Sequence, residues 1–129
     1  MKLELQHVEI HVSSIAAARE FYVDKLGLEL IDDIPALNLI AVRAGGVRIS
    51  LFGGYEPDPS PASNRVGTHI ILRTANLEQA IGELERRGVI FSEGIVEAPG
   101  FIRDIATTDP DGNRIEIAQY LRDPLATRT

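Results

Sequence analysis

The sequence repeats itself, and this repeat limits the folds that its 129 residues can adopt. His7 begins an alternating apolar stretch of strand type, and His69 begins a second one. Each stretch is followed, at the same spacing, by apolar residues with helical periodicity. Farther along, residues 46–51 (GVRISL) match residues 112–117 (GNRIEI) in their glycine, arginine and isoleucine. The chain is therefore predicted to contain two copies of one unit.

Each copy is predicted to have the order β-α-β-β-β, which makes the fold class α+β. The predicted helices cover Ile15–Leu26 and Leu77–Arg87, and a glycine follows each of them. Asn76, with Gln79 three residues later, is the predicted cap of the second helix. The other predicted strands are Leu28–Asp32, Leu37–Ala44 and Val47–Phe52 in the first copy, and Ile90–Ser92 with a ragged continuation to Glu97, Phe101–Thr107 and Arg114–Gln119 in the second.

The chain is expected to form a single domain over residues 1–129. Module one covers residues 3–53, a proline-stiffened linker 54–66, module two 67–120 and a C-terminal tail 121–129. A module of this size with one helix buries too little apolar surface to be stable alone. The two modules must therefore complete a common sheet, either within one chain or between two.

Composition excludes several classes of function. The net charge of −6 and the pI near 5.0 argue against a nucleic-acid surface, and no run of Lys or Arg suits an anionic membrane. No apolar stretch approaches the ~20 residues needed to cross a bilayer. The absence of cysteine excludes disulfides, zinc ribbons and thiol catalysis. With an acidic residue where a signal peptide needs its apolar core, we expect a cytoplasmic protein.

The repeat also marks four positions: His7 with its mate His69, and Ser50 with its mate Glu116. Period-two alternation places these polar side chains on the sheet face opposite the helix, where a ligand can bind. Two imidazoles and one carboxylate around an open site suit iron, manganese, zinc or nickel. His7, His69 and Glu116 are therefore the predicted metal ligands, and Ser50 is interpreted as a small residue that fills the fourth corner.

Each of these positions also has a plainer interpretation. A single strand histidine is more often a structural residue than a ligand, and Glu116 could simply pair with Arg48 or Arg114. Two histidines at equivalent places in a repeat, together with a glutamate, favour the ligand interpretation.

Other residues near these positions have two interpretations each. Glu9 and His11 share the predicted face of His7, so they are a candidate general base and its partner, or exposed strand-end residues. Arg73 is a surface arginine or the counter-charge of an anionic substrate. The aromatic residues are sorted by position: Phe21 and Tyr22 are expected in the core, while Phe52 and Phe101 wall a pocket or belong to the core.

Two segments give the sequence a family resemblance. Phe21-Tyr22 followed by Leu26–Leu28, and Asp109–Glu116 (DPDGNRIE), resemble motifs of the vicinal oxygen chelate superfamily, which includes glyoxalase I, bleomycin-resistance proteins and extradiol dioxygenases. The likeness runs from His7 to about Tyr120. It implies paired β-α-β-β-β modules that form a cupped mixed sheet around a divalent metal ion, which binds two oxygens of a substrate.

The resemblance also implies residue roles. Carried over by position, the metal ligands are His7, His69 and Glu116. Glyoxalase I and methylmalonyl-CoA epimerase place a fourth ligand where this chain has Ser50, which argues against both activities. The three-ligand set is similar to that of extradiol dioxygenases, whose additional catalytic His and Tyr have no counterpart here. Fosfomycin-resistance transferases share it too, but they have a Thr where this chain has Glu9.

The expected function is that of a divalent-metal-dependent enzyme acting on a small oxygen-rich substrate, with Glu9 as the base. The alternative is a metal-free antibiotic-binding protein of the bleomycin-resistance type, and a fold-only relative with a regulatory role is a third possibility. Many small members of the superfamily are homodimers whose modules pair across the subunit interface. A homodimer is therefore expected, without partners among nucleic acids or membranes.

Overall fold

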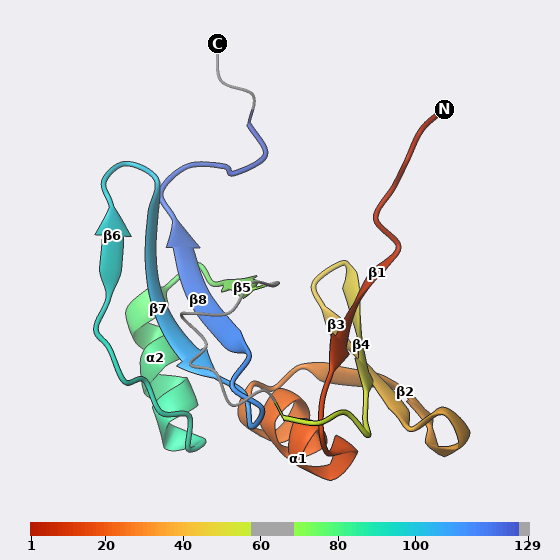
Figure 1. Cartoon of the computed structure of the whole chain (residues 1–129). Coiled ribbons are helices and arrows are strands. Elements are labelled where there is room, and N and C mark those ends of the chain that lie inside the picture. The colour runs from red at the N-terminus through yellow and green to blue at the C-terminus, as the bar shows by residue number, and fades with distance from the viewer. Residues whose placement is uncertain (58–68, 127–129) are drawn as a thin grey trace. The chain divides into compact units, whose positions relative to one another are not determined.

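The computed structural model describes residues 1–57 and 69–126, and the chain divides into two compact units. Unit 1 comprises Met1–Pro59 and Asp109–Asp111, and unit 2 comprises Ser60–Thr108 and Gly112–Thr129. Each unit contains one four-stranded mixed sheet, so the predicted α+β fold with two β-α-β-β-β copies is confirmed (Figure 1). Most of the predicted linker, together with Gly67, Thr68 and the last tail residues, lies outside the described residues.

Unit 1 has the sheet order β1-β4-β3-β2, in which β1 runs parallel to β4 and the other pairs are antiparallel. The parallel pairing places Glu9 opposite Ser50 and Val8 opposite Ile49. The elements are β1 (His7–His11), α1 (Ile15–Arg19), η1 (Glu20–Lys25), β2 (Glu29–Ile34), η2 (Pro35–Leu37), β3 (Leu39–Ala44) and β4 (Val47–Phe52).

The first helix begins where the sequence predicts, but it does not stay α-helical. Ser14 caps it by accepting a hydrogen bond from the Ala17 N–H, and after Arg19 the chain continues as one π-helical segment. Phe21 and Tyr22 are buried on this segment, as predicted, and Gly27 ends it with a φ of 76°. The wider π-turn fits both neighbouring aromatic rings into the core, where they meet edge to face.

Unit 2 repeats the same order, with strands β5-β8-β7-β6 and a parallel β5–β8 pair. Its helix is capped by Asn76, which accepts from the Gln79 N–H at 3.1 Å, so the predicted cap is confirmed. Leu77 and Leu84 on α2 are buried, as are Ile115 and Ile117 on β8, the strand that the helix contacts. The elements are β5 (Ile70–Arg73), α2 (Leu77–Arg86), β6 (Val96–Ala98), β7 (Ile102–Thr108) and β8 (Arg114–Tyr120).

Several strands differ from their predicted limits, and two of the differences have a clear local cause. The residues predicted as strand Ile90–Ser92 are irregular, because the Ile90 carbonyl accepts a hydrogen bond from the Thr107 hydroxyl instead of joining a ladder, and the strand begins only at Val96. In the first copy β3 begins at Leu39 and not Leu37, because residues 35–37 form a 3₁₀ turn. Asn38 follows that turn in the left-handed region, with φ of 52°.

The turn at residues 109–111, between β7 and β8, belongs to unit 1. Tyr22 donates its hydroxyl hydrogen to Asp109 at 2.7 Å, and the Ser13 N–H donates to Asp111 at 3.0 Å. Asp109 also accepts from the N–H of Asp111. Burial, followed by the negative charge of Asp109, raises the pKa of Tyr22 well above its ordinary range. The two acidic residues of the DPDG motif therefore serve the architecture of unit 1.

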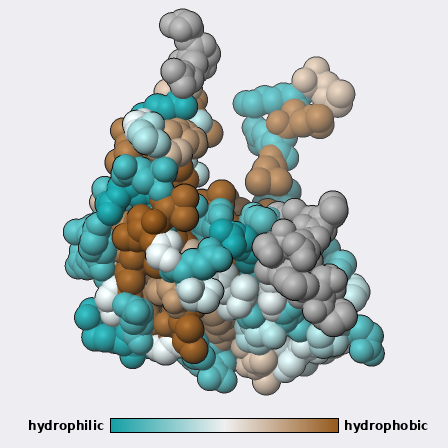
Figure 2. Space-filling model, turned by 60° about the vertical axis from the view of Figure 1, so that its left-hand side comes forward, coloured by the Kyte–Doolittle hydropathy of each residue, from teal (hydrophilic) through white to brown (hydrophobic). Residues whose placement is uncertain are grey.

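In the described part of the chain no helix is long and apolar enough to span a membrane. Several large apolar side chains are nevertheless exposed on the surface. Figure 2 shows apolar side chains reaching the surface over unit 2, where Ile71, Ile90, Val96 and Leu121 are among the exposed large apolar residues.

Candidate metal site and family membership

One polar face of unit 1 carries the first predicted ligand. The register of β1 on β4 puts His7 beside Arg48 and Glu9 beside Ser50. The His7 imidazole lies between two acceptors: Nδ1 contacts the Gln6 side chain, and Nε2 is 3.3 Å from Glu9 Oε1. The Glu9 side chain is 48% exposed, so it is open to a ligand.

Ser50 occupies the position on this face that corresponds to Glu116 in the repeat, and it accepts a hydrogen bond from Arg48. Arg48 donates from Nε to Ser50 Oγ at 3.0 Å and from Nη1 to Asp32 at 3.0 Å. Ser50 is only 2% exposed. The side chains here satisfy one another, which agrees with the interpretation of Ser50 as a small residue that fills space.

In unit 2 the predicted ligands His69 and Glu116 belong to one sheet face. The parallel register pairs Ile71 with Glu116, and His69 precedes Ile71 by two residues. His69 lies one residue before β5, so it does not begin the strand as predicted, but period-two alternation keeps it on the face of Glu116. An imidazole just before β5 and a carboxylate on the neighbouring strand β8 are thus expected on one side of the sheet.

Glu116 also has the arginine partner that the plainer interpretation anticipated. Arg114 donates from Nε to Glu116 Oε1 at 3.1 Å, and the Glu116 side chain is 15% exposed. A second carboxylate lies near this pair: burial and the charge of Glu116 raise the pKa of Asp104, and Arg114 offsets part of that shift. Asp104 and Glu116 are thus close enough for their negative charges to interact, and Arg114 is directly paired with Glu116.

The repeat therefore extends to side-chain contacts. Arg48 and Arg114 occupy equivalent positions, and each donates from Nε to the residue two places along its own strand. Sequence reasoning named both arginines only as possible partners of Glu116 and did not assign Asp32 or Asp104 to either face. The signal for the arginines was present, because both belong to the repeated Gly-x-Arg-Ile pattern.

The three predicted ligands are divided between the units. His7 lies in unit 1, whereas His69 and Glu116 lie in unit 2. Within residues 1–57 and 69–126 no three His, Cys, Asp or Glu side chains are close enough together to hold a metal ion. The chemistry of the donors fits a divalent ion, since two imidazoles and one carboxylate leave open coordination positions. The complete ligand set stays a prediction.

Two of the remaining candidate residues lie apart from these donors. His11 stacks on Tyr55, with ring centroids 4.0 Å apart and an interplanar angle of 2°. Phe101 meets the edge of Tyr120, and the Arg122 guanidinium lies 4.5 Å from the Phe101 ring centre. A partnership of His11 with Glu9 therefore has no contact to support it here.

Several known proteins are similar to this chain. The virulence protein STM3117 of Salmonella typhimurium is 29% identical over 123 residues, which cover 91% of this chain and 84% of that protein. Its crystal structure aligns with a TM-score of 0.71 over 93% of this chain and 98% of that one. The integron cassette protein VCH_CASS1 of V. cholerae is 31% identical, with a TM-score of 0.69 over 93% of this chain and 98% of that one.

A more distant likeness links the chain to an enzyme. The catechol-2,3-dioxygenase of Bacillus subtilis is 28% identical over 61 residues, which are 44% of this chain and 21% of that protein. Residues 4–117 match the family model described as Glyoxalase/Bleomycin resistance protein/Dioxygenase superfamily. Since that match covers most of both β-α-β-β-β copies, the chain belongs to this superfamily.

Proposed function

We propose that the chain is a divalent-metal-dependent enzyme that acts on a small oxygen-rich substrate, with His7, His69 and Glu116 as the metal ligands. The observation that supports this most is the pairing of Glu116 with Ile71, because strand alternation then gives His69, two residues before Ile71, the same face in a member of this superfamily. The interaction between the charges of Asp104 and Glu116 supports it as well, because a cation bound at Glu116 would reduce their repulsion.

The bound ion would supply Lewis-acid polarisation of substrate oxygens. The protein's own residues would do the rest. Gln6 holds one ring nitrogen of His7, which orients the other nitrogen as outer partners of metal-bound histidines do. Glu9 lies beside that second nitrogen and is solvent-accessible, so it is the proposed base that accepts a substrate proton.

Within this class we favour a dioxygenase-like reaction with iron. A three-ligand set without a carboxylate at position 50 differs from the four-ligand glyoxalase I pattern, and the partial similarity to a catechol-2,3-dioxygenase points in the same direction. Ser50 Oγ accepts a hydrogen bond from Arg48, which is itself paired with Asp32, so the place of a fourth ligand holds a hydrogen-bonded hydroxyl and not a carboxylate.

The test is the metal content of protein purified without an affinity tag or added metal. Near-stoichiometric iron, manganese, zinc or nickel is expected in the wild type, and little in the His7→Ala, His69→Ala and Glu116→Ala variants. His11→Ala is the matched control, since His11 shares the strand of His7 but stacks on Tyr55. Metal retained in all three ligand variants would overturn the proposed ligand set. No metal bound on titration of the wild type would overturn the proposal and favour the metal-free antibiotic-binding alternative.

We also propose that the protein works as a homodimer in which unit 1 of one chain completes the site with unit 2 of the other. Equal amounts of the His7→Ala and Glu116→Ala variants, unfolded and refolded together, then yield hybrid dimers with one intact site. About a quarter of the wild-type metal content is expected if the subunits pair at random. A site built within one chain gives none.

A further inference from the structure

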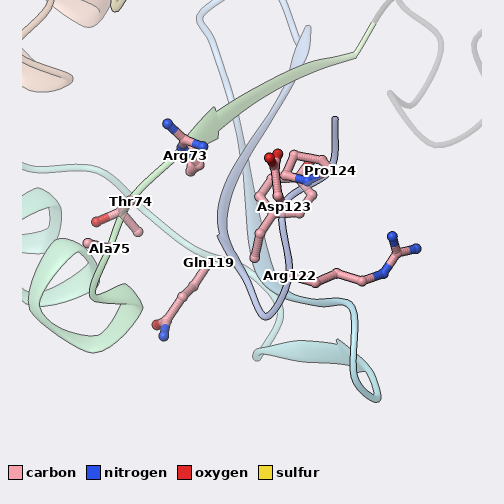
Figure 3. A pocket seen from close by; sticks show the side chains of 8 residues that line it. Arg73, Thr74, Ala75, Gln119, Arg122, Asp123 and Pro124 are labelled. Carbon is pink, nitrogen blue, oxygen red and sulfur yellow. The ribbon is translucent and has the colours of Figure 1, made fainter. Parts of the chain in front are cut away.

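Unit 2 has a pocket that none of the roles above uses. It lies at the carboxyl ends of the parallel strands β5 and β8, beside the start of α2, and its volume is about 580 Å³. Figure 3 shows Arg73 at the end of β5, with Asp123 and Pro124 on the chain beyond β8. The lining residues are Arg73, Thr74, Ala75, Gln119, Tyr120, Arg122, Asp123 and Pro124.

The two arginines of this pocket differ from the others. In the part of the chain that the structure describes, every other arginine forms an ion pair with Asp or Glu. Arg73 forms none, and Arg122 has only the Phe101 ring for its guanidinium. In a chain of net charge −6, two arginines without carboxylate partners at one pocket are a local excess of positive charge.

The neutral polar groups of the pocket are partly engaged already. Gln119 accepts from the Leu77 N–H at 3.0 Å, and the Thr74 hydroxyl bonds the backbone of Asn76. These contacts, with the Asn76 cap, occupy the N–H groups of Asn76, Leu77 and Gln79, so the proposal does not rest on the start of α2. The Gln119 amide still has its N–H donors, and the Arg73 guanidinium keeps all of its own.

Asp123 limits which anions fit. One of its carboxylate oxygens accepts from the Leu125 N–H at 2.9 Å, and its charge remains in the pocket lining. A ligand must therefore place its negative group on Arg73. The Tyr120 ring and Pro124 offer apolar surface for the ligand's body.

We propose that this pocket binds a small organic anion, a carboxylate or a phosphate ester with an apolar or aromatic body, through Arg73. Arg73 comes four residues after His69, and strand alternation gives both side chains the same sheet face. At ~3.3 Å per strand residue, the backbone positions of His69 and Arg73 are about 13 Å apart. Where the proposed metal function holds, the substrate then has an anionic group about that far from the oxygens that bind the ion. The inference rests on the proposed function only in naming that anion a substrate.

The experiment titrates the full-length, metal-free protein with phenyl phosphate, benzoate, inorganic phosphate and the neutral analogue benzamide. Calorimetry gives the affinities, and NMR follows the side-chain N–H signals of the arginines. Phenyl phosphate or benzoate is expected to bind at least about tenfold more tightly than benzamide and to shift the Arg73 signal, because hydrogen bonds to charged groups are worth that much. Tighter binding of phenyl phosphate would indicate a phosphate ester as the ligand, and tighter binding of benzoate would indicate a carboxylate.

Variants make the test specific. Arg73→Gln is expected to weaken binding by about tenfold or more, and Asp123→Asn to strengthen it several-fold, because one repulsive charge is lost. Arg86→Gln is the matched control, since it removes the same charge from an exposed site on α2. Equal affinity for benzamide, or unchanged affinity in an Arg73→Gln variant whose NMR spectrum is otherwise intact, would refute the proposal. Because no metal is present, failure here is separate from failure of the metal site.

Discussion

Replacing Tyr22 by Phe removes one hydroxyl from the junction between the DPDG turn and the first helix. The phenol is 1% exposed and donates at 2.7 Å to Asp109, which is itself 4% exposed. A hydrogen bond to a charged acceptor in such a place contributes about 1.5–3 kcal/mol. We therefore expect Tyr22→Phe to lower the free energy of unfolding by that amount at pH 7, while the ring keeps its packing.

The pH dependence of this loss provides a second test. The pKa of Tyr22 is raised in the folded chain above its ordinary value of 10.0, so the neutral phenol is favoured by folding. The contribution of Tyr22 to the free energy of unfolding is fully present below pH 10, and it falls at higher pH as the Tyr22 phenol ionises in the unfolded chain. At pH 11 the wild type should have lost about 1.4 kcal/mol that Tyr22→Phe does not lose, so the difference between the two proteins narrows.

Urea unfolding followed by circular dichroism at pH 7, 9 and 11 measures both effects. Tyr55→Phe is the control, because Tyr55 is exposed and its hydroxyl has no buried partner. A loss below about 0.5 kcal/mol at pH 7, or a difference that does not narrow between pH 9 and pH 11, would refute the reasoning.

Three further changes test other parts of the structure. Gly53→Ala should cost about 1–3 kcal/mol of stability, because a Cβ there would lie 2.7 Å from Asn38 Nδ2 and 2.8 Å from Ile15 Cγ1. Gly46→Ala is the control: a Cβ there has nothing within 4 Å, so stability in the same urea titration should not change. Asn76→Ala should cost about 1 kcal/mol by removing the cap of α2, and Asn76→Asp should restore most of it. Asp104→Asn should stabilise the metal-free protein at pH 7, because folding raises the pKa of Asp104 and so disfavours its charged form. The gain in stability should vanish below pH 3.8, the ordinary pKa of the group. Equal stability of the wild type and the variant at pH 7 would contradict this prediction.

Much of the fold follows from local sequence patterns. The limits of β4 are predicted to the residue, because a Gly-Gly turn and strict alternation mark both ends. The strand over Ile90–Ser92 fails because a long-range contact, the Thr107 hydroxyl on the Ile90 carbonyl, overrides a short β-branched run. The π-helical segment is likewise invisible in the sequence, since apolar spacing alone does not reveal how two adjacent rings are packed.

The candidate site is predictable in its residues but less so in its surroundings. The repeat identifies the positions of His69 and Glu116, and the register pairs Glu116 with Ile71, two residues after His69; the role of both as ligands stays a prediction. The pairing of Arg48 with Asp32 depends on a strand two places away in the sheet, so no local pattern announces it. The same holds for the anion pocket, because its residues come from a strand end, a loop before α2 and the chain after β8.

NMR of the histidine rings during a Zn²⁺ titration can show whether His7 and His69 bind the same metal ion. The chain has only three histidines, so their ring signals can be followed one by one. We expect the His7 and His69 signals to shift together and to saturate at one Zn²⁺ per chain. The signal of His11, which stacks on Tyr55, should not shift. Unchanged signals, or a shift of His7 without His69, would contradict a single metal site built from both units.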